Sequence, residues 1–156
     1  MKRVWVFCDG STGALETKDG AVGGSGPRAP LTCGAGAVAL DADGRIVGWD
    51  WRPLPPLTNN EAEYAGLLLA IGLARRLRAA EAIFLLDSEI VVGQMTGRCA
   101  VNSRALHRWH RQACMAAREL PAARYIFIPR EWNRLADGLA AQAGISWAWL
   151  RERVMG

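Results

Sequence analysis

A long apolar helical pattern between residues 59 and 77 constrains the fold of this chain more than any other feature. Leucine, isoleucine and alanine cover so much of this helix that it has to be buried. Thr58 and Glu61 fit the capping box that begins a helix, in which the glutamate folds back onto a free backbone amide. The proline-rich residues 52–57 are expected to form a stiff, extended connector to this helix. A chain of 156 residues is therefore organised around one central helix.

The length and the apolar content, about half of all residues, predict one domain spanning residues 1–156. Five stretches have the composition of strands, and they are residues 3–9, 33–40, 45–51, 82–87 and 125–128. Residues 12–31 are rich in glycine and proline and predict a long irregular loop. The tail, residues 145–156, carries two tryptophans and is expected to pack on the domain.

Three aspartates occupy positions where a fold could gather them. Asp9 shares a strand face with tryptophan and phenylalanine, Asp87 follows a strand that is apolar on both faces, and Asp137 lies early in a late helix. A carboxylate is expensive to bury without a partner. In open α/β sheets the working site lies at the carboxyl ends of the strands, where Asp87 is found. The alternative for Asp9 is a turn cap beside Gly10.

Glu63 adds a fourth acid from the start of the buried helix. It lies two residues from Glu61, about 200° around the helix, so the two side chains cannot face the same site. Glu61 already serves the helix end, whereas Glu63 has no such role; a solvated first-turn acid is the alternative. Four carboxylates brought together from four elements would repel one another unless cations lay between them. The acids therefore predict a metal site.

The positive charge is concentrated in one part of the chain. The formal net charge is +4, and all the cationic residues except Lys2 and Lys18 are arginines, which suit bidentate phosphate contacts. Between residues 98 and 134 there are two glutamates against eight arginines, at positions 98, 104, 108, 111, 118, 124, 130 and 134. This segment predicts either a phosphate-tracking surface or a solvated basic face.

The cysteines and the N-terminus bear on the compartment. Cys8, Cys33, Cys99 and Cys114 have no metal-site or redox spacing, so they are interpreted as free thiols of a reducing compartment. The first apolar run is too short for a signal peptide, and no stretch of about 20 apolar residues could cross a membrane. A cytoplasmic protein without membrane contact is expected.

The motifs, taken in order, resemble type 1 ribonuclease H. The resemblance is carried by Asp9-Gly10-Ser11, by Thr58-Asn59-Asn60-Glu61-Ala62-Glu63-Tyr64, by Asp87-Ser88, and by Asn133-Arg134-Leu135-Ala136-Asp137-Gly138-Leu139-Ala140. It spans nearly the whole chain. Each motif is weak alone, but their combination and order are specific.

The resemblance implies an α/β fold with a mixed five-stranded sheet, antiparallel in its first three strands and then parallel, with helices on both faces. It implies endonucleolytic hydrolysis of the RNA strand of RNA/DNA hybrids, which leaves 5′-phosphate and 3′-hydroxyl ends. By family role, Asp9, Glu63, Asp87 and Asp137 are the catalytic ligands of two divalent ions. Mg²⁺ fits these hard oxygen ligands, with Mn²⁺ as a substitute. A monomer is expected.

The same resemblance implies contacts to the hybrid, whose ribose 2′-hydroxyls distinguish RNA from DNA. Side chains expected to contact the substrate are Asn59, Asn60, Gln94, Asn102, Arg98 and Arg104. Gly10 and Ser11 are expected to approach the scissile phosphate through their backbone amides.

Two departures from the best-known family pattern are visible. The loop before Asp137 is short and holds no histidine, as in a bacterial and archaeal branch where an arginine takes that place, so Arg130 is the candidate for an auxiliary catalytic role. There is also no lysine-rich basic protrusion after Gly97. Hybrid affinity would then depend on the arginines of residues 98–111, or on another domain or partner.

Rival classes remain open at this stage. A catalytically weak binding module of the same fold would need the basic segment but not the acids. A related metal-dependent nuclease shares acidic sites but lacks the series from Thr58 to Glu63. A sugar-kinase-like phosphotransferase would need two such domains around a cleft, which 156 residues cannot supply.

Overall fold

The computed structural model describes residues 2–12 and 33–143. The strands are β1 (Arg3–Ser11), β2 (Cys33–Leu40), β3 (Ile46–Leu54), β4 (Glu81–Leu86) and β5 (Ala123–Phe127). The helices are α1 (Asn59–Arg76), α2 (Glu89–Met95), α3 (Arg104–Ala117), the short 3-10 helix η1 (Arg130–Trp132) and α4 (Arg134–Ala143). The predicted loop, all but Thr12, and the predicted tail lie outside the described residues.

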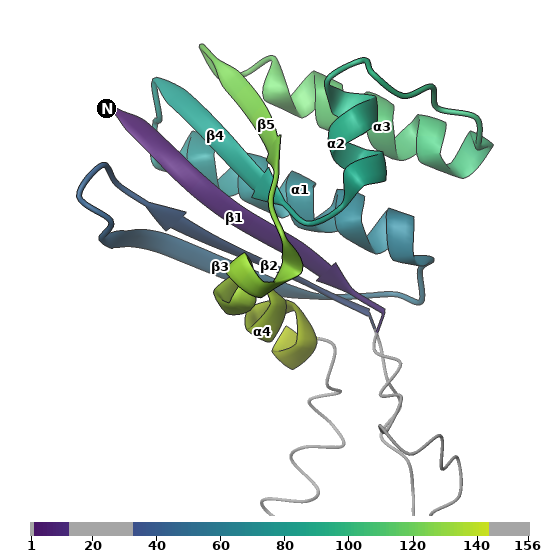
Figure 1. The fold of residues 1–156 in the computed structure, drawn as a ribbon, viewed down its shortest axis with the longest axis horizontal. Coiled ribbons are helices and arrows are strands. Elements are labelled where there is room, and N and C mark those ends of the chain that lie inside the picture. Colours follow the sequence, from purple (N-terminus) through teal and green to yellow (C-terminus); the bar gives the residue numbers. More distant parts are fainter. Residues whose placement is uncertain (1, 13–32, 144–156) are drawn as a thin grey trace, which may run out of the picture.

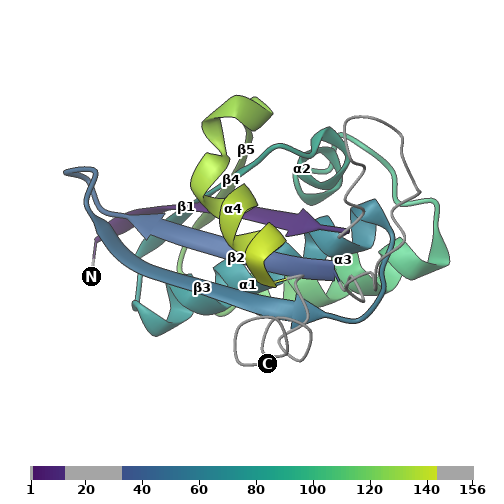
Figure 2. The same ribbon diagram turned by 90° about the horizontal axis from the view of Figure 1, so that it is seen from below.

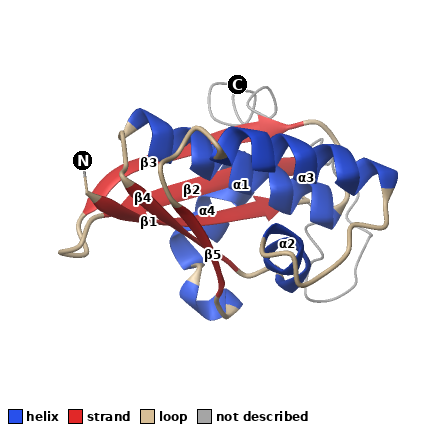
Figure 3. Ribbon diagram, turned by 90° about the horizontal axis from the view of Figure 1, so that it is seen from above, coloured by secondary structure: helices blue, strands red, loops and turns tan. Residues whose placement is uncertain are grey.

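The five strands form one mixed sheet in the order β3-β2-β1-β4-β5 (Figure 1). β1, β2 and β3 are antiparallel neighbours, while β4 runs parallel to both β1 and β5. Helix α4 lies on one face of the sheet (Figure 2), and α1 and α3 lie on the other (Figure 3). The predicted mixed sheet with helices on both faces is confirmed.

Helix α1 is the central element that its sequence predicts. Its N-cap Thr58 and Glu61 form both halves of the capping box. Tyr64, Leu67 and Ile71 of α1 are fully buried, together with the β1 residues of one strand face. The other face of β1, with Trp5 and Phe7, packs in a second cluster with β4. The predicted division of β1 into two faces is therefore confirmed.

Strand β3 is longer than predicted. Residues 52–54, expected to belong to an extended connector, pair with β2, and Pro53 lies opposite Gly34. β3 is an edge strand, so its outer side needs no ladder hydrogen bonds and proline is tolerated there. Strand β1 likewise runs to Ser11, two residues beyond the predicted end of this strand at Asp9.

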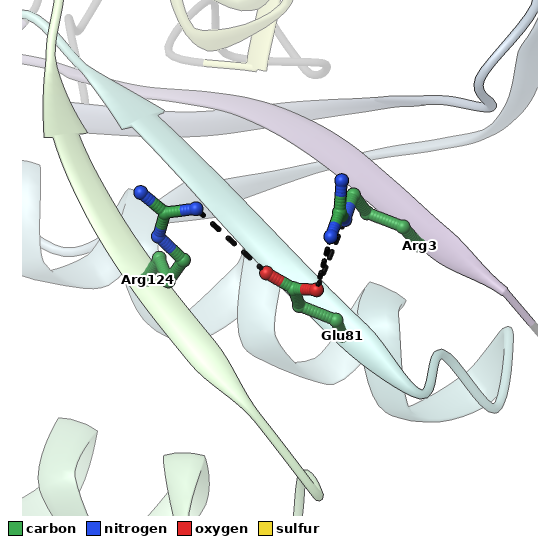
Figure 4. Close-up of polar contacts among 3 residues, drawn as sticks. All are labelled: Arg3, Glu81 and Arg124. Atoms are coloured by element: carbon green, nitrogen blue, oxygen red, sulfur yellow. Dashed lines mark hydrogen bonds and ion pairs between the residues drawn. The ribbon is translucent and has the colours of Figure 1, made fainter.

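An ion-pair cluster joins three strands at the end of the sheet where β1, β4 and β5 begin. Glu81 accepts from Arg3 at 2.9 Å and lies 4.0 Å from the Arg124 guanidinium (Figure 4). These side chains are partly exposed, so each pair contributes little to stability. Here acidic and basic side chains neutralise one another.

All four cysteines are free, as predicted. Among the described residues, no helix has both the length and the apolar character needed to cross a membrane.

Candidate metal centre

Asp9 and Asp87 are neighbours because β1 and β4 are parallel and in register. Phe7 of β1 pairs with Leu85 of β4, and each aspartate lies two residues further along. Side chains two apart share one face of a sheet. The register therefore brings both carboxylates to the same end and the same face. Asp9 is only 4% exposed, an unusual burial for a carboxylate.

Glu63 reaches Asp9 because the first turns of α1 lie directly on the end of β1. A Cβ added to Gly10 would lie 2.6 Å from the Glu63 nitrogen, and one added to Gly66 would lie 2.5 Å from the Asp9 carbonyl oxygen. Real Cβ atoms do not approach other atoms this closely. Glycine at both positions thus permits the backbone contact that places Glu63 beside Asp9.

Asp137 comes from the opposite face of the sheet. Gly36 is the β2 partner of Asp9, and helix α4 rests on it, since a Cβ there would lie 2.6 Å from the Ala136 carbonyl oxygen. The Asp137 carboxyl, 42% exposed, interacts with Asp9 and is one cause of the raised Asp9 pKa. The small residues of β2 permit this close helix contact.

The three most buried acids could hold a cation together. Asp9, Glu63 and Asp87 each offer a carboxylate oxygen, and these oxygens lie within 4.8 Å of one another. One buried oxygen of Glu63, Oε2, has no hydrogen-bond partner among residues 2–12 and 33–143. Carboxylate oxygens are the ligands that Mg²⁺ prefers. The donor set therefore fits a divalent ion.

The electrostatics of the cluster are those of acids held together against repulsion. Burial, and then the charge of Glu63, raise the pKa of Asp9 well above its ordinary range. Burial raises the pKa of Glu63 to about 7, although a hydrogen bond from the Gly10 amide opposes this rise. Burial also raises the pKa of Asp87. A bound cation would favour the charged form of all three groups.

Arg130 lies beside the acids. Its guanidinium is 4.0 Å from an Asp137 oxygen, and its charge acts to lower the pKa of both Glu63 and Asp87. The side chain is 79% exposed. Arg130 is thus an exposed cation at the rim of the site. It is the residue for which the sequence predicted an auxiliary catalytic role.

The residues predicted to contact substrate are spread over the neighbouring elements. Asn59 and Asn60 are the first two residues of α1, Arg104 is the first residue of α3, and Gly10 and Ser11 end β1. Arg98 and Asn102 are exposed in the segment between α2 and α3.

Gln94 differs from this group because it is buried. Its Oε1 accepts from the Tyr64 hydroxyl, and its Nε2 donates to the Ala100 carbonyl at 3.4 Å. Both ends of the amide are engaged within the protein.

Asn133 is a polar residue at the site whose role the sequence does not reveal. Its position before α4 predicts a helix cap, and its carbonyl does accept from the Asp137 amide. The side chain, however, turns inward and donates to the Cys8 carbonyl at 2.9 Å. No spacing or composition signal distinguishes this orientation from an ordinary cap.

Comparisons with known proteins agree with this fold. Residues 24–143 match the sequence model of a family described as Reverse transcriptase-like. The "Bifunctional protein Rv2228c" of Mycobacterium tuberculosis is 36% identical over 130 residues, which are 83% of this chain and 34% of that protein. This chain spans about a third of the length of the curated relatives it matches first.

Solved structures are similar over most of the chain. The N-terminal RNase H domain of Rv2228c has a TM-score of 0.75 and 32% identity, covering 90% of this chain and 92% of that one. RNase H1 of the archaeon Halobacterium salinarum has a TM-score of 0.76 and 27% identity, covering 90% and 96%. LC11-RNase H1, solved in complex with an RNA/DNA hybrid, has a TM-score of 0.72 and 26% identity, covering 90% and 96%.

The fold is that of a ribonuclease H-like protein. Within that class, the chain belongs to the type 1 ribonuclease H family.

Proposed function

We propose that this chain is an endoribonuclease that hydrolyses the RNA strand of RNA/DNA hybrids with two divalent ions. The observation that carries the proposal is the convergence of Asp9, Glu63 and Asp87 from three elements within 4.8 Å. Family membership supports the reaction class, and LC11-RNase H1, solved with a hybrid, supports the substrate class. Activity as a monomer in the cytoplasm is part of the proposal.

The metal ligands proposed are Asp9, Glu63, Asp87 and Asp137, with Mg²⁺ as the ion and Mn²⁺ as a substitute. The unpartnered Oε2 of Glu63 and the hard oxygen donors support this choice. When bound, two such ions would activate a water and stabilise the departing oxygen of an in-line displacement.

The products follow from which bond breaks. The water oxygen bonds to phosphorus, the bond from phosphorus to the 3′ oxygen breaks, and the 3′ oxygen takes up a proton. The products are therefore a 5′-phosphate and a 3′-hydroxyl. We assign Arg130 an auxiliary role, because its exposed guanidinium lies beside Asp137 and can reach a phosphate group.

Substrate contacts are proposed for residues at the end of β1, at the starts of α1 and α3, and in the segment between α2 and α3. They are Gly10, Ser11, Asn59, Asn60, Asn102, Arg98 and Arg104, and the arginines supply contacts to phosphate. Gln94 would have to release Tyr64 or Ala100 to reach a hybrid with its side chain. Its role in binding is therefore the least supported of this set.

The experiment is cleavage of matched duplexes of one sequence, RNA/DNA, RNA/RNA and DNA/DNA, labelled on one strand, with Mg²⁺ or with a chelator. We expect cleavage of the RNA strand of the hybrid only, and only with metal. The fragments should be ligatable through their 5′-phosphate. Metal-dependent binding of hybrid without cleavage would indicate a binding module, and cleavage of DNA/DNA would indicate a different nuclease.

A further inference from the structure

Asn133 lies at the junction of η1 and α4, and its side chain is entirely buried. The buried polar or charged residues among those described are Asp9, Gln94 and Asn133. Burying an amide is unfavourable unless hydrogen bonds replace those made with water. The hydrogen bonds of Asn133 therefore indicate the role of this buried side chain.

These contacts lead to three of the carboxylate-bearing segments. The Nδ2 group donates to the carbonyl of Cys8, the residue before Asp9, at 2.9 Å. The same side chain lies beside the Asp87 carboxyl and acts to lower the pKa of that carboxyl. The backbone carbonyl accepts from the Asp137 amide at 3.0 Å. One residue thus contacts β1, the end of β4 and the first turn of α4.

We propose that Asn133 is a positioning residue that fixes Asp9, Asp87 and Asp137 relative to one another for metal binding. This inference rests on the proposed function. The side-chain amide carries two hydrogens; one is donated to the Cys8 carbonyl, and the second is available to the neighbouring Asp87 carboxylate. Groups that orient the ligands of a metal typically change its affinity or the activity 10- to 100-fold when they are removed.

The other end of the amide argues against a purely stabilising role. The Oδ1 of Asn133 is buried and has no hydrogen-bond partner within the described part of the chain. A buried acceptor without a partner is unfavourable, because its hydrogen bonds to water are lost without replacement. A small apolar residue would avoid that cost. Asn133 is therefore better explained by what its Nδ2 group orients than by the stability that it contributes.

The test compares Asn133→Ala with Leu73→Ala in the full chain. Leu73 is buried in α1 and contacts Gly48 of β3, away from the carboxylates. Both substitutions remove buried atoms, so both are expected to lower the melting temperature of the metal-free protein. Two quantities are then measured, the Mn²⁺ concentration that gives half of the metal-induced rise in melting temperature, and kcat and KM on a labelled hybrid.

For Asn133→Ala we expect the Mn²⁺ midpoint to rise at least about tenfold and kcat to fall about 10- to 100-fold, with KM for the hybrid changed less than twofold. Leu73→Ala should keep the wild-type Mn²⁺ midpoint. Asn133→Ser keeps one donor and should give an intermediate midpoint; it also serves as the measured variant if Asn133→Ala does not fold.

A wild-type Mn²⁺ midpoint in the Asn133 variants would overturn the inference alone, provided that the wild type itself responds to metal and cleaves. A wild type whose melting temperature does not respond to Mn²⁺ would overturn the proposed function, and with it the positioning role. The Mn²⁺ dependence of the melting temperature is measured without turnover, so the failure of the inference and the failure of the proposed function are distinguishable.

Discussion

At the scale of single residues, two glutamates two positions apart in α1 have different tasks. Glu61 accepts from the Thr58 amide at 3.2 Å and from the indole of Trp109 at 3.0 Å, and these bonds lower its pKa. Glu63 is turned the other way, beside Asp9, with one carboxylate oxygen unpartnered. The helix geometry separates a structural acid from a proposed metal ligand within one turn.

This division predicts opposite outcomes for the two positions. Glu63→Gln should abolish hybrid cleavage and leave the metal-free protein as stable as the wild type or more stable, because one repelling charge is removed. Glu61→Ala should keep cleavage and lose about 0.5–2 kcal/mol of stability, the usual cost of a lost cap. Turnover and denaturant unfolding of both variants check this. Loss of cleavage in Glu61→Ala at a temperature where it is folded would contradict the assignment.

The raised pKa of Glu63 predicts how stability changes with pH. Its ordinary value is 4.5 and the folded value is about 7, so between these limits the folded chain holds more protons than the unfolded chain. The free energy of unfolding therefore falls as pH rises from about 4.5 to 7. Melting temperatures in a chelator should show this fall, Glu63→Gln should flatten it, and Mg²⁺ should oppose it. Equal slopes for wild type and Glu63→Gln would refute the explanation.

At the scale of elements, the site depends on close backbone packing between helices and strands. Gly66 allows α1 to touch the β1 backbone at Asp9, and Gly36 allows α4 to touch β2. These two contacts bring Glu63 and Asp137 to the sheet from opposite faces. The distance between carboxylates is therefore set by glycines that carry no chemistry themselves.

Two glycines of the same helix make a matched test of this packing. Gly66→Ala should force α1 away from β1, lowering both stability and the rate of cleavage. Gly72→Ala, whose added Cβ would meet only the end of the Arg76 side chain at 3.6 Å, should gain up to about 1 kcal/mol from helix propensity. Melting temperature and kcat are measured for both. A Gly66→Ala variant with wild-type kcat would show that the close contact is not required.

The sequence was informative about elements wherever a local signal exists. The capping box placed the start of α1, and Ser88, a residue type typical of helix starts, accepts from the Val91 amide at the start of α2. Pro53 was misinterpreted because proline marks a connector unless the strand is at an edge, and strand order is not a local property. The inward orientation of the Asn133 side chain could not be predicted for a related reason, since a helix cap and an inward-facing amide have the same sequence context.

At the scale of the whole molecule, the two ends of the sheet differ in the arrangement of their charged side chains. Glu81 is neutralised by Arg3 and Arg124 where β1 begins, and the acid cluster lies where β1 ends. The exposed arginines at positions 98 and 104 lie in the segment from α2 to α3. A net charge of +4 would assist association with a polyanion generally. The specific attraction is expected from this arginine segment.

Salt dependence tests that expectation. The logarithm of hybrid affinity should fall linearly with the logarithm of salt concentration, and each lost phosphate contact should reduce the slope by about one. Arg98→Ala and Arg104→Ala should each show this reduction. Arg45→Ala is the control, because the turn between β2 and β3 lies at the opposite end of the sheet from Asp9. Equal slopes in all three variants would remove these arginines from the binding surface.

The measurement that tests the central claim most directly is cleavage of a labelled RNA/DNA hybrid in Mg²⁺ by the wild type, by Asp87→Asn and by Glu89→Gln. Asp87 belongs to the acid cluster, whereas Glu89 is an exposed acid two residues away in the first turn of α2. We predict cleavage by the wild type and by Glu89→Gln, and none by Asp87→Asn. Equal cleavage by wild type and Asp87→Asn, or no cleavage by any of the three, would contradict the two-metal assignment.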